Sequence, residues 1–241
     1  MRGLMSRLFE ELDRQATAIG EISLRRRLEP TLQIDVFEVK IGEDGLMSSL
    51  ITDGEEAVST LGLAATSNDD LDVLVGGLGL GYTAHTALLD TRVRSLRVVD
   101  ALAPVIDWHN RHLAPLSESL DTDDRCEFVL GDFFDLAARG FPLDDGAPAT
   151  FDAVLLDIDH SPRHLLDPKN AAFYEPAGTE LLVQSIRPGG VYSLWSNDPP
   201  DDEYLAVLTS AFDTAVAEVV TFPNVLTGID TSSTIYVATR A

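Results

Sequence analysis

Short apolar runs alternate with stretches of helical spacing from residue 71 to the end of the chain. Apolar runs bounded by turn residues are typical of buried strands, and apolar positions three or four residues apart are typical of helices. The predicted strands are 71–75, 95–99, 126–130, 151–156, 191–195, 216–222 and 233–238. The predicted helices are 82–89, 103–113, 133–138, 175–186 and 202–212. This alternation predicts a doubly wound α/β fold with a parallel sheet, whose last two strands pair antiparallel.

The first 65 residues have a different pattern. An amphipathic helix is expected at 4–12, followed by three strands and a second helix. The strands are expected at 18–27, 34–41 and 46–51, and the helix at 55–65. Glu29-Pro30 and the segment 42–45 supply the turns, so the strands should form an antiparallel meander. A polar segment at 66–70 marks the predicted boundary between an N-terminal β annex, 1–65, and the main domain, 66–241.

Composition and charge narrow the class of protein. The chain has 241 residues, 45% of them hydrophobic, which is enough for a large core. The single cysteine, Cys126, excludes an internal disulfide framework. No apolar run approaches the length of about 18 residues that a membrane span needs, and the N-terminus lacks the apolar core of a secretory signal. We therefore expect a cytoplasmic protein that does not associate with membranes.

The chain is strongly acidic. Its 40 acids and 17 lysines and arginines give a net charge of −23. Such a charge repels nucleic acid, so no nucleic-acid partner is expected. It attracts cations and is compatible with a cationic substrate, although acidity also serves solubility alone.

A glycine-rich turn gives the sharpest local signal. Gly77-x-Gly79-x-Gly81 follows the strand 71–75 and precedes a helix. Glycines permit positive φ and let a ligand approach the backbone, so the turn predicts a nucleoside or nucleotide site at the carboxyl ends of the strands. Gly79-x-Gly81-x-x-Ala84 equally satisfies the dinucleotide fingerprint, and a tight structural turn is the remaining alternative.

Acids follow three strands of the predicted sheet. Asp100 ends the second strand, Asp132 follows the third, and Asp157 ends the fourth. The carboxyl ends of parallel strands meet at one edge, so these acids should face one site. Asp100 is expected to bind ribose hydroxyls, with a helix cap as the alternative. A nicotinamide enzyme needs only this first acid, so the succession favours an adenosyl-sulfonium ligand.

The sequence resembles the spermidine synthase (polyamine aminopropyltransferase) family. The family's glycine motif lies over 77–83, and its Glu-Ile-Asp-x-x-Val lies over 100–105. Its Gly-Asp-Ala and Asp-Ser-Ser/Thr-Asp-Pro motifs lie over 131–133 and 157–161. The resemblance implies a Rossmann-like class I methyltransferase fold, with a seven-stranded, mostly parallel sheet behind a small antiparallel β domain. It also implies a homodimer.

The resemblance assigns roles to individual residues. It implies cofactor contacts from Gly77, Gly79, Gly81, Asp100, Asp132, Phe133 and Asp157. The expected co-substrate is S-adenosylmethionine or its decarboxylated form. The matching positions at the amine end differ from the family. Leu80 stands where the family has an aspartate, His160 replaces a second aspartate, and the family's Tyr-His-Glu has no match at 54–58.

These departures predict a rewritten amine site. We expect Asp157 to take the proton of an amine acceptor, and Asp159 or His160 to orient that acceptor. His160 is itself a candidate base, or a surface loop histidine. Pro162 separates His160 from His164, so no metal site is expected. Trp195 and Phe173-Tyr174 are expected in the core rather than in a pocket wall.

The sequence thus predicts a spermidine synthase-like transferase that moves an alkyl group from an adenosyl-sulfonium donor to a small-molecule amine. A methyltransferase is the first alternative, because Leu80 removes a repulsion against the carboxylate of full S-adenosylmethionine. A non-catalytic nucleoside-binding or scaffold protein of the same fold is the second. A nicotinamide oxidoreductase is the least favoured.

Overall fold

The computed structural model describes residues 8–143 and 146–241 and contains two β-sheets. The larger sheet has seven strands in the order β10-β11-β9-β8-β5-β6-β7. These strands are β5 (Leu71–Gly76), β6 (Val93–Asp100), β7 (Cys126–Leu130), β8 (Phe151–Leu156), β9 (Ile186–Ser196), β10 (Thr214–Pro223) and β11 (Asp230–Thr239). Neighbours pair in parallel from β7 to β9, and β11 runs antiparallel to both β9 and β10. The predicted α/β fold and the antiparallel pairing of the last two strands are confirmed.

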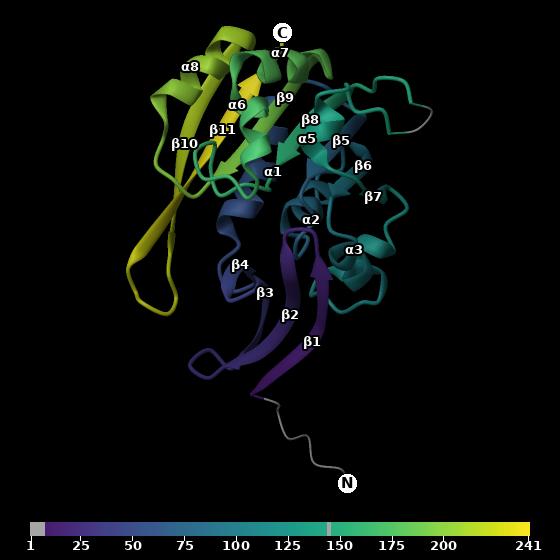
Figure 1. Cartoon of the computed structure of the whole chain (residues 1–241). Coiled ribbons are helices and arrows are strands. Elements are labelled where there is room, and N and C mark those ends of the chain that lie inside the picture. The colour runs from purple at the N-terminus through teal and green to yellow at the C-terminus, as the bar shows by residue number, and fades with distance from the viewer. Residues whose placement is uncertain (1–7, 144–145) are drawn as a thin grey trace.

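Helices cover both faces of this sheet (Figure 1). One face packs against α1 (Asp53–Ala65), α2 (Tyr82–Leu88), α3 (Ala103–Asn110) and α4 (Ser117–Asp121). The other face packs against α5 (Phe133–Ala137), α6 (Ala171–Tyr174), α7 (Pro176–Gln184) and α8 (Asp202–Ala211). The short helices α4 and α6 were not predicted. Apolar side chains on both faces give the strands near-continuous hydrophobic sequences, as expected for a sheet buried on both sides.

The smaller sheet, the annex, is a four-stranded antiparallel meander. Its strands are β1 (Phe9–Thr17), β2 (Gly20–Glu29), β3 (Ile34–Ile41) and β4 (Asp44–Ser48), and they lie beneath the large sheet in Figure 1. Its buried residues Ile22, Leu24 and Val39 belong to the same hydrophobic cluster as α1 and α2. Helix α1 itself packs on the large sheet. The division of the chain at residue 65 stays a prediction.

The helix expected at 4–12 is wrong from Phe9 onward, because this stretch begins β1; residues 4–7 lie outside the described residues. Cross-strand charge pairs outweigh the helical spacing of its apolar residues. On β2, Arg26 Nη2 lies 2.7 Å from Glu10 Oε2 of β1. The next residue, Arg27, forms an ion pair with Glu38 of β3, with Nε and Oε1 2.7 Å apart.

In the described part of the chain, no helix is both long and apolar enough to cross a membrane.

Candidate active site

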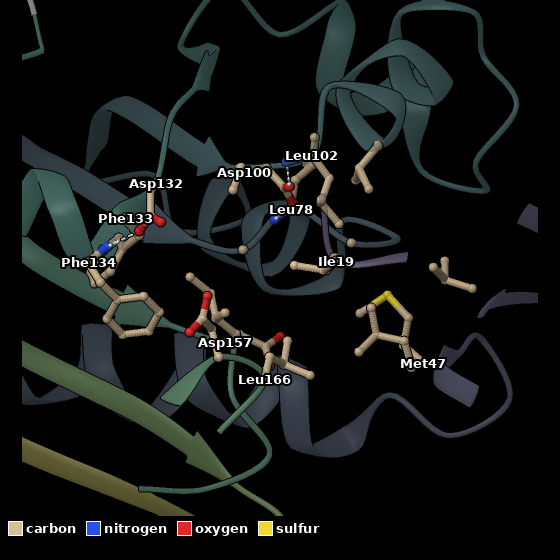
Figure 2. A pocket seen from close by; sticks show the side chains of 18 of the residues that line it. Ile19, Met47, Leu78, Asp100, Leu102, Asp132, Phe133, Phe134, Asp157 and Leu166 are labelled. Carbon is tan, nitrogen blue, oxygen red and sulfur yellow. Dashed lines mark hydrogen bonds between the residues drawn. The ribbon is translucent and has the colours of Figure 1, made fainter. Parts of the chain in front are cut away.

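A cavity of about 680 Å³ lies between the annex and the carboxyl ends of β5, β6, β7 and β8 (Figure 2). Backbone hydrogen bonds continue beyond the strand ends and hold this edge together. Asp157 N donates to Gly76 O at 2.8 Å, Gly77 N to Val99 O at 2.9 Å, and Gly131 N to Asp100 O at 3.0 Å. The volume is in the range of small-ligand sites.

The glycine turn forms the floor of the cavity, and its conformation requires glycine. Gly77, Gly79 and Gly81 have φ values of 94°, 47° and 95°. A Cβ on Gly77 would lie 2.2 Å from the carbonyl oxygen of Asp157, and one on Gly79 would lie 2.4 Å from Met47 Cε. The turn therefore packs against β8 on one side and the annex on the other. These close contacts give the glycines a structural role as well as a place in the cavity wall.

Asp100 ties the glycine turn to the loop before α3. Its carboxylate accepts hydrogen bonds from Leu78 N at 3.0 Å and Leu102 N at 2.8 Å. Burial raises the pKa of Asp100, and these backbone donors oppose the shift. The backbone of Gly79 is a third donor to this carboxylate. A carboxylate has about four acceptor sites, so one remains for a ligand in the cavity that Asp100 lines, and a ribose hydroxyl fits it.

Asp132 caps α5 and lines the cavity. Its Oδ1 accepts from Phe134 N and Asp135 N, and Lys169 Nζ donates to its Oδ2 at 2.7 Å. Burial acts in the opposite direction, but the hydrogen bonds from Lys169 and the helix backbone keep the pKa of Asp132 below its ordinary value.

The next two aromatic residues have different surroundings. Phe133 is only 2% exposed; its ring is tilted against Phe141, meets Phe173 edge-on and lies close to Gly76. Phe134 is half-buried, and its ring faces the cavity in Figure 2. The predicted Phe133 therefore contributes mainly to the core, and Phe134, which the sequence analysis did not single out, presents the larger aromatic surface to a ligand.

Asp157 projects into the middle of the cavity (Figure 2). Thr83 Oγ1 donates to its Oδ2 at 2.8 Å, and Thr83 in turn accepts at its carbonyl oxygen from Ser59 Oγ at 2.6 Å. Thr83 Oγ1 also lies 3.3 Å from the carbonyl oxygen of Glu55, in the first turn of α1. One threonine therefore links Asp157 on the sheet edge to Glu55, which lines the same cavity.

Glu55 and Asp157 form a pair of carboxylic acids with raised pKa values. Burial, and then the negative charge of Asp157, raise the pKa of Glu55 to about 8. Burial raises the pKa of Asp157 to about 6, against the hydrogen bond from Thr83. Two carboxylates that share a partly desolvated site hold a proton more tightly than isolated ones. Burial and the mutual repulsion of the two carboxylates therefore favour retention of a proton by the pair at neutral pH.

The sequence contains a signal for Glu55 that its mismatch with the family motif concealed. Residues 58, 59, 62 and 63 form the buried face of α1, and Glu55 lies three and four positions before the first two of them. An acid on the apolar stripe of a helix is costly unless it faces a polar site. Its position on that stripe therefore points to the cavity.

Asp159 and His160, the other two predicted catalytic residues, are placed differently. His160 lines the cavity and accepts a backbone hydrogen bond from Asn197 N at 2.8 Å. Asp159 is buried outside the lining, and its carboxylate accepts from Asn170 Nδ2, Tyr174 OH and Leu166 N. These bonds make Asp159 an anchor for the loop that follows β8, so the structure does not bring it to the reacting position.

The annex supplies an apolar wall. The five annex residues that line the cavity are Ala18, Ile19, Val39, Leu46 and Met47. Met47 Sδ lies 3.1 Å from Leu80 N, and Leu80 is only 1% exposed. Trp195, at the end of β9, is half-buried; it packs against the core, as expected, and in addition lines the cavity. Phe173 and Tyr174 are in the core as predicted.

Charge in the cavity wall is mainly negative. Five of the described lining residues are acids, namely Glu55, Asp100, Asp132, Asp157 and Asp167, and Lys169 is the one lysine or arginine among them. No group of three or more histidines, cysteines and acids suited to a metal ion occurs within residues 8–143 and 146–241. The wall can therefore stabilise a cationic ligand by direct electrostatic attraction.

Comparison with known proteins gives a match by structure. No family model matches the sequence, and no curated protein sequence matches it. A spermidine synthase in complex with the transition-state analogue AdoDATO has a TM-score of 0.72 and 14% identity, over 96% of this chain and 74% of that chain. The spermidine synthase from Thermotoga maritima has a TM-score of 0.71 and 15% identity, over 96% and 72%. At this identity the likeness establishes the fold, which is the one that the sequence resemblance predicted.

Proposed function

We propose that this protein is a transferase that binds an adenosyl-sulfonium donor and moves an alkyl group from its sulfur to an amine acceptor. The observation that carries the proposal is the Glu55–Asp157 pair, two acids with raised pKa values that line one cavity beside the glycine turn. The spermidine synthase fold supports the same reaction class. The decarboxylated donor is favoured, because it has no carboxylate to be repelled by the acidic wall.

The donor supplies an electrophilic carbon that its sulfonium charge already activates. The acceptor's nitrogen lone pair forms the new carbon–nitrogen bond while the carbon–sulfur bond breaks, and the bonding pair returns to sulfur. The nitrogen proton passes to Asp157, whose pKa of about 6 is nearer that of an amine than an ordinary carboxyl would be. Asp100 and Asp132 are assigned to the nucleoside, and Thr83 orients Asp157 through its hydroxyl.

The test combines calorimetry with product detection. Decarboxylated S-adenosylmethionine is titrated first, and a panel of amines is then screened by mass spectrometry for the alkylated amine and the adenosine thioether. Asp157→Asn is expected to retain donor binding within about tenfold and to lose 100-fold or more in turnover, the range typical of a lost proton acceptor. Asp124→Asn, at an exposed site in the turn before β7 and outside the cavity lining, is the matched control. Unchanged turnover in Asp157→Asn would overturn the mechanism.

Methyl transfer from full S-adenosylmethionine is the second candidate, and Leu80 is the observation that favours it. This residue leaves the cavity wall without the carboxylate that the resemblance places at its position. Parallel titrations with both donor forms distinguish the two reactions, since a tenfold preference corresponds to about 1.4 kcal/mol. Binding of neither form would leave a non-catalytic protein of this fold as the better interpretation.

A further inference from the structure

We propose that the acceptor is a monoamine with an apolar body, such as an alkylamine or arylalkylamine, and not a diamine or longer polyamine. This inference rests on the proposed function, because it names the class of acceptor for the same cavity. Three observations carry it: the position of the paired acids, the chemistry of the annex wall, and the prior engagement of the other acids.

The paired acids provide one place for one amine. Glu55 and Asp157 line the cavity where α1 meets the end of β8, and the Thr83 hydroxyl contacts both the Asp157 carboxylate and the backbone carbonyl oxygen of Glu55. Because the pair retains a proton near neutral pH, it carries the charge that neutralises a single ammonium.

The annex residues that line the cavity have no charged or hydrogen-bonding side chain for a second amine. All five of its lining residues are aliphatic side chains or methionine, from the β1–β2 turn and from β3 and β4. In Figure 2, Ile19 and Met47 lie on one side of Asp157, and Asp132 and Phe134 lie on the other. A chain that leaves the paired acids toward the annex therefore meets only apolar surface. Burying an ammonium there without a partner is strongly unfavourable, whereas burying methylene or aryl groups is favourable.

The other acids that line the cavity lie away from the annex wall and already accept hydrogen bonds from protein groups. Both oxygens of Asp100 accept backbone N–H groups, and Asp132 accepts from the α5 backbone and from Lys169. Asp100 and Asp132 lie on the edge that we assign to the nucleoside. Asp167, the fifth lining acid, accepts from Lys169 N at 3.0 Å and lies 3.7 Å from Lys169 Nζ, which also binds Asp132. None of these three acids is placed to neutralise the far end of an acceptor that extends along the annex.

The cavity is open to solvent at one end of the annex wall. Ile19 lies in the turn between β1 and β2 and is 41% exposed, although it lines the cavity. An apolar acceptor therefore has room to extend past Ile19 toward solvent. The same exposure makes this position suitable for mutation, because a charged side chain there can reach water and should leave the fold intact.

The experiment uses matched pairs of amines with the full-length protein and decarboxylated S-adenosylmethionine. Hexylamine is compared with 1,6-diaminohexane, and benzylamine with 4-(aminomethyl)benzylamine, by kcat/KM for formation of the alkylated product. The expected result is a preference of tenfold or more for the monoamine in each pair. A preference for the diamines would overturn the inference and leave the proposed function standing. Donor binding without alkylation of any amine would overturn the proposed function itself, and the inference with it.

A charge added to the wall tests the cause of the preference. Ile19→Glu places a carboxylate on the annex side and should shift the monoamine-to-diamine ratio by tenfold or more toward the diamine. Ile34→Glu is the matched control, because Ile34 is 45% exposed on the same small sheet but does not line the cavity. Its ratio should equal that of the unmodified protein. Equal ratios in both variants would show that the annex wall does not contact the acceptor.

Discussion

The two sides of the cavity are built in different ways. The sheet side consists of residues at or just after the ends of strands, and backbone hydrogen bonds from Gly77, Gly131 and Asp157 fix it to neighbouring strands. The annex side consists of side chains from β3, β4, the β1–β2 turn and the start of α1, and they meet the sheet through packing. The sheet side is therefore determined by residues close together in sequence. The annex side forms only when segments distant in sequence pack together.

Chemistry follows the same division. The sheet side carries Asp100, Asp132 and Asp157, which suit a polar nucleoside and a cation. The annex side carries an apolar wall and one acid, Glu55, which reaches across to Asp157. Donor and acceptor would therefore be recognised by different segments of the chain, so the annex can change the acceptor without altering the donor site. The four predictions below test this division, from the largest expected effect to the smallest.

Gly77→Ala should break the sheet side and give the largest loss. The new Cβ would lie 2.2 Å from a backbone oxygen of Asp157, at a φ of 94° that side chains rarely adopt. We expect a loss of about 4 kcal/mol in the free energy of unfolding, near the upper end for one substitution, together with loss of donor binding. Urea unfolding measures the first and calorimetry the second.

The control for this substitution is Gly42→Ala in the annex. Gly42 has a φ of 57°, and a Cβ there would have no heavy atom within 4 Å. Only the cost of the left-handed conformation should remain, about 1–2 kcal/mol, with donor binding intact. Equal losses in the two variants would mean that the close approach of the glycine turn to β8 contributes nothing.

The sheet side was predictable because the signals were local. Glycine turns and acids after apolar runs placed Gly77, Asp100, Asp132 and Asp157 at one edge before any contact was known, and all of them line the cavity. Phe133 shows the limit of that approach. Asp132 caps α5, and each further helical residue turns by about 100°, so a shift of one residue separates a core side chain from a ligand-facing one.

The annex side was not predictable from local pattern. Ile19 and Met47 read as ordinary strand residues and Glu55 as an ordinary helix residue, and their place in the cavity depends on how the small sheet packs against the glycine turn. The error over β1 has the same origin, because pairing with β2 decides its conformation and spacing alone does not. The acceptor site is therefore the part of the function that the sequence specifies least directly.

Glu55→Gln should show how much Glu55 contributes to the pH dependence of the free energy of unfolding. The folded state raises the pKa of Glu55 from 4.5 to about 8, so it binds a proton more tightly than the unfolded chain does. The free energy of unfolding of the unmodified protein should therefore fall as pH rises from about 4.5 to about 8. Glutamine does not titrate, so the variant should be more stable by up to about 4 kcal/mol at pH 8 and about equal at pH 4.

Thermal unfolding at the two pH values measures this difference. Glu180→Gln on α7 is the control, since that side chain is exposed and does not line the cavity. It should unfold like the unmodified protein at both pH values. If the advantage of Glu55→Gln were the same at pH 4 and pH 8, Glu55 would not be held protonated by its surroundings.

Trp108→Phe should remove a contact between the annex and the main domain and lower the free energy of unfolding by a smaller amount. Trp108 Nε1 on α3 donates to Asp13 Oδ2 on β1 at 2.8 Å, and the indole is fully buried. Loss of a hydrogen bond to a charged group should cost about 1.5–3 kcal/mol in urea unfolding. Trp195→Phe removes a bond to the neutral Ser233 hydroxyl at 3.2 Å and should cost about 1 kcal/mol or less. The reverse order would remove Trp108 as a contact that fixes the annex on the main sheet.

Lys169→Met should have the smallest effect on stability and yet distinguish the two donors. Lys169 is more than half exposed and pairs with Asp132 at 2.7 Å, so its loss should cost less than about 1 kcal/mol. It also removes the one lysine or arginine among the described residues that line the cavity. A decarboxylated sulfonium donor, cationic throughout, should then bind slightly more tightly, by about two- to threefold at low salt. Full S-adenosylmethionine would lose a partner for its carboxylate and bind more weakly. Calorimetry with both donors should therefore show a rise in affinity for the decarboxylated donor and a fall for full S-adenosylmethionine. If the affinity for the decarboxylated donor does not rise, the acidic sheet edge does not select for a donor without a carboxylate.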